Sequence, residues 1–157
     1  MKWWKRQGIF FKEDLTVKSD LTLLNQVLSW FDELCFRNQS KLSWLADKSA
    51  RQYIRLDEIK LALDEGFTNA VRHAHENLPS ETPIEIQFTL WDDRLEIRIW
   101  DQGEPFDPNT LTEPAPGTLQ EGGFGWSLIR RLTDRVSYER GEDGRNCLLL
   151  VKRKPYS

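Results

Sequence analysis

The chain has 157 residues, of which 39% are hydrophobic, and this is enough to build one domain with a substantial core. Its 22 Lys and Arg residues against 25 Asp and Glu residues give a formal charge of −3, which argues against a protein that binds nucleic acid through clustered positive charge. The two cysteines lie far apart, and no apolar stretch is long enough to span a membrane. We therefore expect a cytoplasmic protein that contacts neither nucleic acid nor membrane directly.

The first predicted elements are a strand and a helix. Residues 11–17 predict an opening strand. Ser19 and Asp20 are suited to cap a helix, because the apolar residues over 21–34 recur at helical spacing. Residues 37–52 indicate a second helix or an ordered connector whose boundaries the sequence leaves open.

The middle of the chain combines a helix, a β-hairpin and a loop. The pattern predicts a helix that begins at Asp57, as its N-cap, and ends near Asn77. Apolar residues then alternate with polar ones over 84–90 and 95–99, which predicts a hairpin with one buried face. Residues 102–123 are rich in Pro and Gly and predict a loop, and a loop this long is usually functional.

A short helix and a second hairpin are predicted at the end of the chain. The helix covers residues 125–134, and the hairpin joins 136–138 to 147–152. Helices combined with antiparallel hairpins predict an α+β fold arranged as a two-layer sandwich.

The helix predicted from Asp57 carries the first group of candidate site residues. One arc of it is polar and holds Glu65, Asn69, Arg72 and His73, whereas the opposite side carries Leu63, Phe67, Ala70 and Ala74. Most polar helix faces are simply solvated, but Gly66, Thr68 and Asn69 are unfavourable inside a helix, which indicates selection for function. An Asn oxygen can bind Mg²⁺, and a carboxylate one turn earlier can deprotonate a nucleophile.

Two further motifs indicate a nucleotide. Asp101 and Gly103 stand where a predicted strand ends. A carboxylate there can accept a hydrogen bond from an exocyclic amine such as that of adenine, and a glycine lets a flat ring approach the backbone. The residues Gly122, Gly123, Phe124 and Gly125 precede a helix, where successive backbone amides form a phosphate site.

Other chemistry finds less support in the sequence. The chain has no Gly-Lys-Ser/Thr of a P-loop, and the segment 123–128 lacks the third glycine of a dinucleotide fingerprint. His73 and His75 cannot both face one metal from a helix, so we expect no zinc site. We expect His73 to lie in the pocket wall or on the helix surface and His75 to be exposed.

In this order the three motifs resemble those of the GHKL (Bergerat-fold) ATPases, and most of all the small bacterial anti-sigma-factor serine/threonine protein kinases. The resemblance is carried by Glu-Gly-Phe-Thr-Asn-Ala-Val-Arg-His-Ala at 65–74, Asp-Gln-Gly-Glu-Pro-Phe-Asp-Pro at 101–108 and Gly-Gly-Phe-Gly-Trp-Ser-Leu-Ile at 122–129. It implies a single histidine-kinase-like ATPase domain over 1–157, with an N-terminal extension at 1–10. The implied sheet is mixed and mostly antiparallel, with helices on one face.

The resemblance also implies roles for individual residues. Glu65 would be the general base, and Asn69 would bind both Mg²⁺ and the nucleotide. His73 would line the ATP pocket, Asp101 would anchor adenine, and Gly103 would form its floor.

The remaining implied roles concern the phosphates and the pocket rim. Gly122, Gly123, Phe124 and Gly125 would hold the phosphates, and residues 104–121 would form a lid over ATP.

Two departures from the family pattern stand out. Glu104-Pro105 stands where the wider family often repeats a glycine in the motif that begins at Asp101. Asn146 stands near the position where the family commonly has a Thr, and that Thr supports the adenine side of the site.

The function implied is an ATP-dependent serine/threonine kinase that phosphorylates an anti-sigma-factor antagonist and sequesters a sigma factor, with homodimerisation. The alternative is a non-catalytic module that senses nucleotide and regulates a partner. Intact Glu65 and Asn69 favour the kinase, whereas Glu104-Pro105 leaves room for the module.

Overall fold

The computed structural model describes residues 8–44, 50–104 and 125–155. In chain order the described elements are β1 (Ile9–Lys18), a 3₁₀ turn (Leu21–Leu23), α1 (Leu24–Arg37), α2 (Ala50–Asn69), a π-helical turn (Ala70–Ala74), β2 (Pro83–Trp91), β3 (Arg94–Asp101), α3 (Gly125–Leu132), β4 (Arg135–Arg140) and β5 (Asn146–Arg153).

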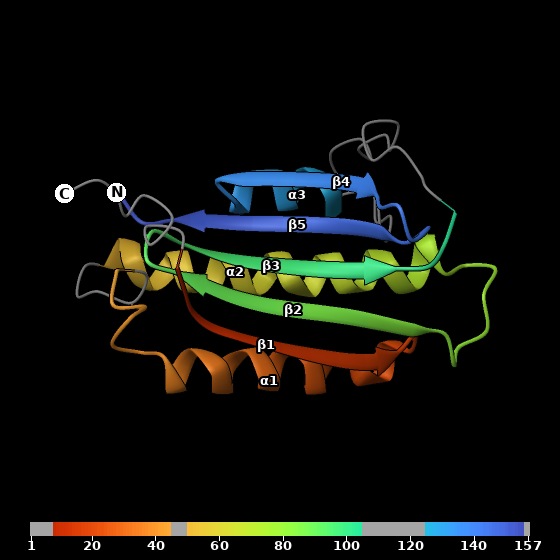
Figure 1. Ribbon diagram of the computed structural model, residues 1–157, viewed down its shortest axis with the longest axis horizontal. Helices are drawn as coiled ribbons and strands as arrows, with labels where there is room; N and C mark the ends of the chain where they lie inside the picture. The colour runs from red at the N-terminus through yellow and green to blue at the C-terminus, as the bar shows by residue number, and fades with distance from the viewer. Residues whose placement is uncertain (1–7, 45–49, 105–124, 156–157) are drawn as a thin grey trace, which may run out of the picture.

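The described strands form one sheet in the order β1-β2-β3-β5-β4, and every neighbouring pair is antiparallel. The helices α1, α2 and α3 all cover the same face of this sheet (Figure 1). The predicted α+β fold with two layers and helices on one face is therefore confirmed. The implied mixed sheet is wrong for the described strands, because each of their pairs is antiparallel.

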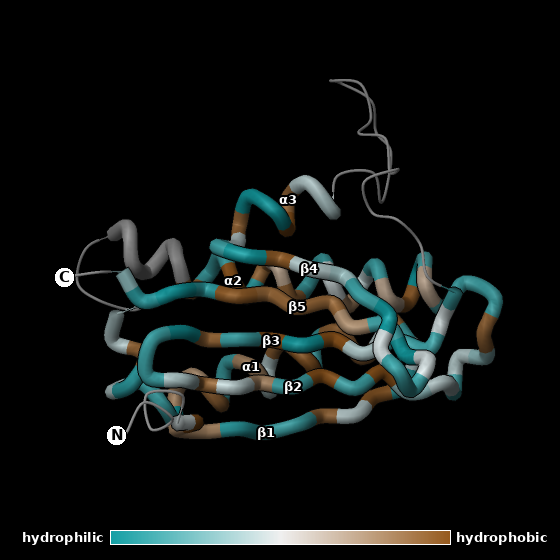
Figure 2. Tube along the Cα trace, turned by 45° about the horizontal axis from the view of Figure 1, so that its top comes forward, coloured by the Kyte–Doolittle hydropathy of each residue, from teal (hydrophilic) through white to brown (hydrophobic). Residues whose placement is uncertain are grey.

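The hydrophobic core lies between the sheet and the helices. Phe88 of β2 is fully buried in it, with its ring 5.9 Å from that of Phe31 on α1 and 6.0 Å from that of Phe11 on β1. The strand β5 is predominantly hydrophobic (Figure 2), because four apolar residues follow one another at 148–151. Such a run suits a strand in the interior of a sheet.

Helix α2 lies unusually close to the sheet at Gly66. A Cβ atom on Gly66 would lie 2.8 Å from Ile99 Cδ1 on β3 and 2.9 Å from Leu148 Cδ2 on β5. This contact explains why a residue unfavourable in helices stands here, and it holds α2 against two central strands.

The predicted start of the helix at Asp57 is wrong, because α2 begins at Ala50. Asp57 is exposed within the helix rather than capping it. Residues before it, such as Ala50 and Leu56, are good helix formers, so no local signal stops the helix at Asp57. At the other end the α-helix gives way at Asn69 to the π-helical turn.

Candidate active site

Helix α2 and the start of α3 bring together three of the predicted site residues. A Cβ atom on Gly125, the first residue of α3, would lie 3.0 Å from Glu65 Oε2 and 3.2 Å from Asn69 Oδ1. The carboxylate and the carboxamide one turn apart on α2 therefore both face the helix N-terminus, where backbone N–H groups favour anions. The buried side predicted for this helix is also confirmed, since Leu63, Phe67, Ala70 and Ala74 are buried.

The environment of Glu65 suits a proton acceptor. Partial burial raises the pKa of the Glu65 carboxyl, the neighbouring carboxylate of Asp64 raises it further, and Arg72 partly offsets both. A general base works best when its pKa lies nearer the working pH than that of a free carboxylate.

Asn69 places its carboxamide at the N-terminus of α3. The residue is 7% exposed, and its Oδ1 and Nδ2 lie 3.2 Å and 3.3 Å from the position of a Cβ atom on Gly125. A ligand bound at the start of α3 would therefore meet this carboxamide.

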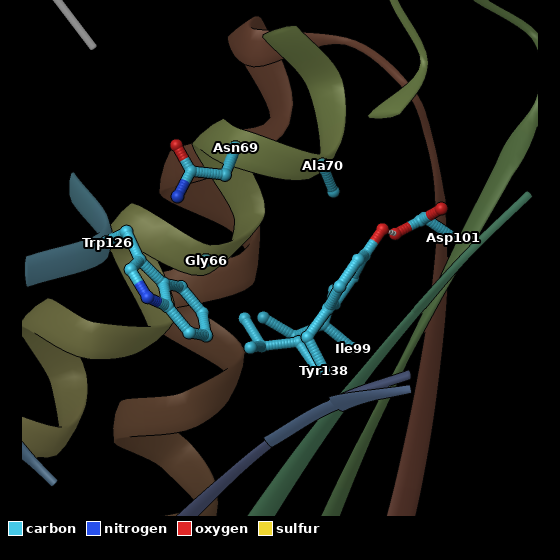
Figure 3. A pocket seen from close by; sticks show the side chains of 8 residues that line it. Gly66, Asn69, Ala70, Ile99, Asp101, Trp126 and Tyr138 are labelled. Atoms are coloured by element: carbon cyan, nitrogen blue, oxygen red, sulfur yellow. Dashed lines mark hydrogen bonds between the residues drawn. The ribbon is translucent and has the colours of Figure 1, made fainter. Parts of the chain in front are cut away.

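Asp101 lies at the end of β3 in a network of hydrogen bonds. Its side chain is 2% exposed. Its Oδ1 accepts hydrogen bonds from the backbone N–H of Gly103 at 3.0 Å and from Asn146 Nδ2 at 2.8 Å, and its Oδ2 accepts one from the Tyr138 hydroxyl at 2.9 Å (Figure 3). Burial is the main cause that raises the pKa of Tyr138, and the charge of Asp101 and this hydrogen bond raise it further. The hydroxyl therefore keeps its proton.

Gly103 packs directly on the end of the π-helical turn. A Cβ atom on Gly103 would overlap the backbone carbonyl group of Ala74. Only a glycine allows this approach, and it brings the loop after β3 against the end of the helix that carries Glu65 and Asn69.

Asn146, where the resemblance led us to expect Thr, links Asp101 to Gly103. Its Nδ2 donates to Asp101 Oδ1 at 2.8 Å and to the carbonyl oxygen of Gly103 at 3.0 Å, and the residue is fully buried. One carboxamide thus fixes both residues at this end of β3.

We expect Asn146→Ala to lower the free energy of unfolding by about 1–3 kcal/mol, since it removes the Asn146 donor from the Gly103 carbonyl and one of the three donors to the buried Asp101 carboxylate. Urea denaturation followed by circular dichroism measures this loss. Gln87→Ala, on the open face of β2, is the control and should change stability by less than about 0.5 kcal/mol. Equal effects of both substitutions would contradict a supporting role for Asn146.

A pocket between α2, α3 and the sheet connects the two ends of the site. It is lined by Gly66, Asn69, Ala70, Ile99, Asp101, Trp126, Tyr138 and Leu148. Figure 3 shows the aromatic side chains of Trp126 and Tyr138 directed into it. The sequence reasoning did not assign these two aromatic residues to the site, although the inward position of Tyr138 follows from its alternation with neighbours on β4.

Not all of the predicted site residues can be placed. Gly122, Gly123 and Phe124 lie outside the described residues, as does nearly all of the segment 104–121 assigned to the lid. His73 lies half-buried in the π-helical turn.

The expectation that His75 is exposed is wrong. The side chain is only 3% exposed, and its Nε2 accepts a hydrogen bond from the backbone N–H of Gln102 at 2.8 Å. The chain turns at Ala74 and passes against the end of β3, so a residue that a continuing helix would expose becomes enclosed.

Two features are absent from the residues that the structure describes. These residues contain no group of three or more His, Cys, Asp or Glu side chains arranged to hold a metal ion. None of their helices has the length and apolar character needed to cross a bilayer.

Comparison with known proteins places this chain in a family. The model of the histidine kinase-like ATPase domain matches residues 17–152. A serine-protein kinase RsbW of Oceanobacillus iheyensis is 38% identical over 104 residues, which are 60% of this chain and 65% of that protein. A serine-protein kinase RsbW of Halalkalibacterium halodurans is 34% identical over 119 residues, 71% of this chain and 70% of the relative. The chain thus spans about two thirds of the length of these relatives.

A solved structure shows the same fold. The RsbU and RsbW domains of a Mycobacterium tuberculosis protein match with a TM-score of 0.58 at 17% identity, over 92% of this chain and 33% of that one. The resemblance drawn from the three motifs is confirmed by these comparisons. Since the family model covers most of the chain and the fold agrees with it, the chain belongs to the histidine kinase-like ATPase domain family.

Proposed function

We propose that this chain is an ATP-dependent serine/threonine protein kinase of the anti-sigma-factor type. The observation that carries the proposal is the convergence of Glu65, Asn69 and the N-terminus of α3, with Asp101 buried at the other end of the same pocket. The similarity to the serine-protein kinases RsbW supports the reaction type.

In the proposed reaction the two ends of the site act on different parts of ATP. Asp101 accepts a hydrogen bond from the 6-amino group of adenine, and Gly103 lets the ring approach the backbone. Glu65 takes the proton from a serine or threonine hydroxyl of the protein substrate, and the oxygen of that hydroxyl attacks the γ-phosphorus of ATP. The bond from that phosphorus to the bridging oxygen breaks, and ADP leaves.

The donor set of the site fits Mg²⁺. Asn69 and Glu65 offer hard oxygen atoms close together, and Mg²⁺ is usually held by one or two protein groups together with substrate phosphates. Asn69 would hold the ion, which when bound would neutralise charge on the phosphates.

The proposed partners are an anti-sigma-factor antagonist, which receives the phosphate, and a sigma factor, which the chain sequesters in the cytoplasm. We also propose that two copies associate through β1 and α1. Three exposed apolar side chains there support this surface: Ile9 at 48%, Phe10 at 52% and Phe36 at 70% exposed.

Phosphate transfer to the antagonist tests the function. The purified chain should transfer the γ-phosphate of labelled Mg-ATP to a serine or threonine of a candidate antagonist protein from the same organism. Nucleotide binding without transfer would instead favour a non-catalytic module that senses nucleotide.

Asn69→Ala should remove the metal-dependent part of nucleotide affinity while the fold stays intact. The reason is that the truncation deletes the proposed oxygen ligand without opening the apolar side of α2. Titration calorimetry with ADP, with and without Mg²⁺, measures the effect, and Asn77→Ala, on the exposed turn after the helix, is the control. An unchanged magnesium dependence would show that Asn69 is not the ligand.

A further inference from the structure

His75 connects the end of the helical segment to the loop that carries the adenine-side residues. Its Nε2 accepts the 2.8 Å hydrogen bond from the backbone N–H of Gln102. Gln102 stands between Asp101 and Gly103, the two residues that we propose bind adenine. The contact with His75 therefore fixes the backbone between them. The next amide, that of Gly103, donates to Asp101 Oδ1 at 3.0 Å.

The protonation state of His75 follows from this contact. A ring nitrogen that accepts a hydrogen bond carries no proton, so the ring is neutral and its proton is on Nδ1. Burial lowers the pKa of His75, partly offset by the charge of Asp101, and this favours the neutral ring.

The other ring nitrogen shows that this histidine is not placed for stability alone. Nδ1 is buried and has no hydrogen-bond partner among the described residues. An unsatisfied buried donor is unfavourable, and an apolar residue of similar size would avoid the cost. The contact of Nε2 with Gln102 gives a reason for a histidine at this position.

We propose that His75 is a positioning residue for adenine recognition, holding the backbone of Gln102 so that Asp101 and Gly103 meet the base in a fixed geometry. This inference rests on the proposed role of Asp101 as the acceptor for the 6-amino group. The turn after the helix would then contribute to the selectivity for adenine.

The test compares binding of Mg-ADP and Mg-IDP to the intact chain by calorimetry. IDP carries an oxygen where ADP carries the 6-amino group, so the ratio of the two dissociation constants reports on base recognition. A general weakening of the site would change both constants equally and leave the ratio unchanged.

Three variants separate the positioning role from packing. His75→Phe removes the acceptor and should reduce the preference for ADP roughly three- to tenfold. His75→Gln should keep the preference, because its Oε1 reaches the place of Nε2. His75→Asn, one methylene shorter, should lose the preference as His75→Phe does.

The outcomes are distinguishable. If the chain prefers ADP and both His75→Phe and His75→Asn retain the full preference, the positioning role is overturned. If His75→Phe does not fold, the pair of His75→Gln and His75→Asn decides in the same way, since both are polar. If the unmodified chain binds ADP and IDP equally, the proposed role of Asp101 fails, and the inference fails with it.

Discussion

Replacement of Glu65 by Gln is expected to lower the rate of phosphate transfer by about 10²- to 10⁴-fold while the affinity for nucleotide changes little. Glutamine keeps the size and hydrogen-bonding atoms of the side chain but cannot take the proton of the attacking hydroxyl. Single-turnover transfer to the antagonist measures the chemical step, and calorimetry measures binding. Glu76→Gln, an exposed carboxylate beyond the helix, is the matched control. Full transfer by the Glu65 variant would show that another group is the base.

The pH dependence of transfer gives a second check on the same residue. Burial and the charge of Asp64 raise the pKa of Glu65. Because the base must be unprotonated, transfer should fall as the pH drops through this raised pKa, at a higher pH than for an ordinary glutamate. Asp64→Asn should move this acidic limb to lower pH, and an unmoved limb would assign it to another group.

Gly103→Ala is expected to abolish detectable adenine-nucleotide binding and to lower the free energy of unfolding by about 1–3 kcal/mol. The added methyl group would overlap the carbonyl group of Ala74, and backbone atoms cannot move aside as a flexible side chain can. The loop would have to leave the end of the helical segment and take Asp101 out of position. Calorimetry with Mg-ADP and urea denaturation measure the two effects.

A second glycine provides the control for Gly103→Ala. In Gly141→Ala the new Cβ atom would lie 3.1 Å from Asp143 Oδ1, at the end of an exposed side chain that can shift. This variant should bind Mg-ADP like the unmodified chain and lose less than about 1 kcal/mol of stability. Normal nucleotide binding by Gly103→Ala would contradict the contact with Ala74.

Local sequence patterns predicted much of the fold and the helical part of the site. The period of the helix places Glu65 and Asn69 on one polar arc, and both face the start of α3. The end of the alternating pattern in β3 identified Asp101, which is buried where the strand ends. Their roles in binding and catalysis stay predictions until the variants above are measured.

The remaining site residues depend on tertiary contacts that no local pattern encodes. His75 is enclosed because the chain turns against β3, and Asn146 reaches Asp101 from the neighbouring strand β5. Tyr138 comes from the edge strand β4, whose order in the sheet differs from its order in the chain. The order of the strands in the sheet decides which side chains meet. The sequence of a single strand does not specify that order.

The close contact of α2 with the sheet at Gly66 sets the distance between the two ends of the proposed site. Glu65 and Asn69 flank this glycine on the helix, while Ile99, which the glycine touches, lies two residues before Asp101 on β3. The two ends of the proposed site, the phosphate end on α2 and the adenine end at Asp101, are therefore held at one separation by this contact. In the proposed function a larger residue at position 66 would change that separation, so its effect would reach both ends together and would not add to that of a substitution at either end.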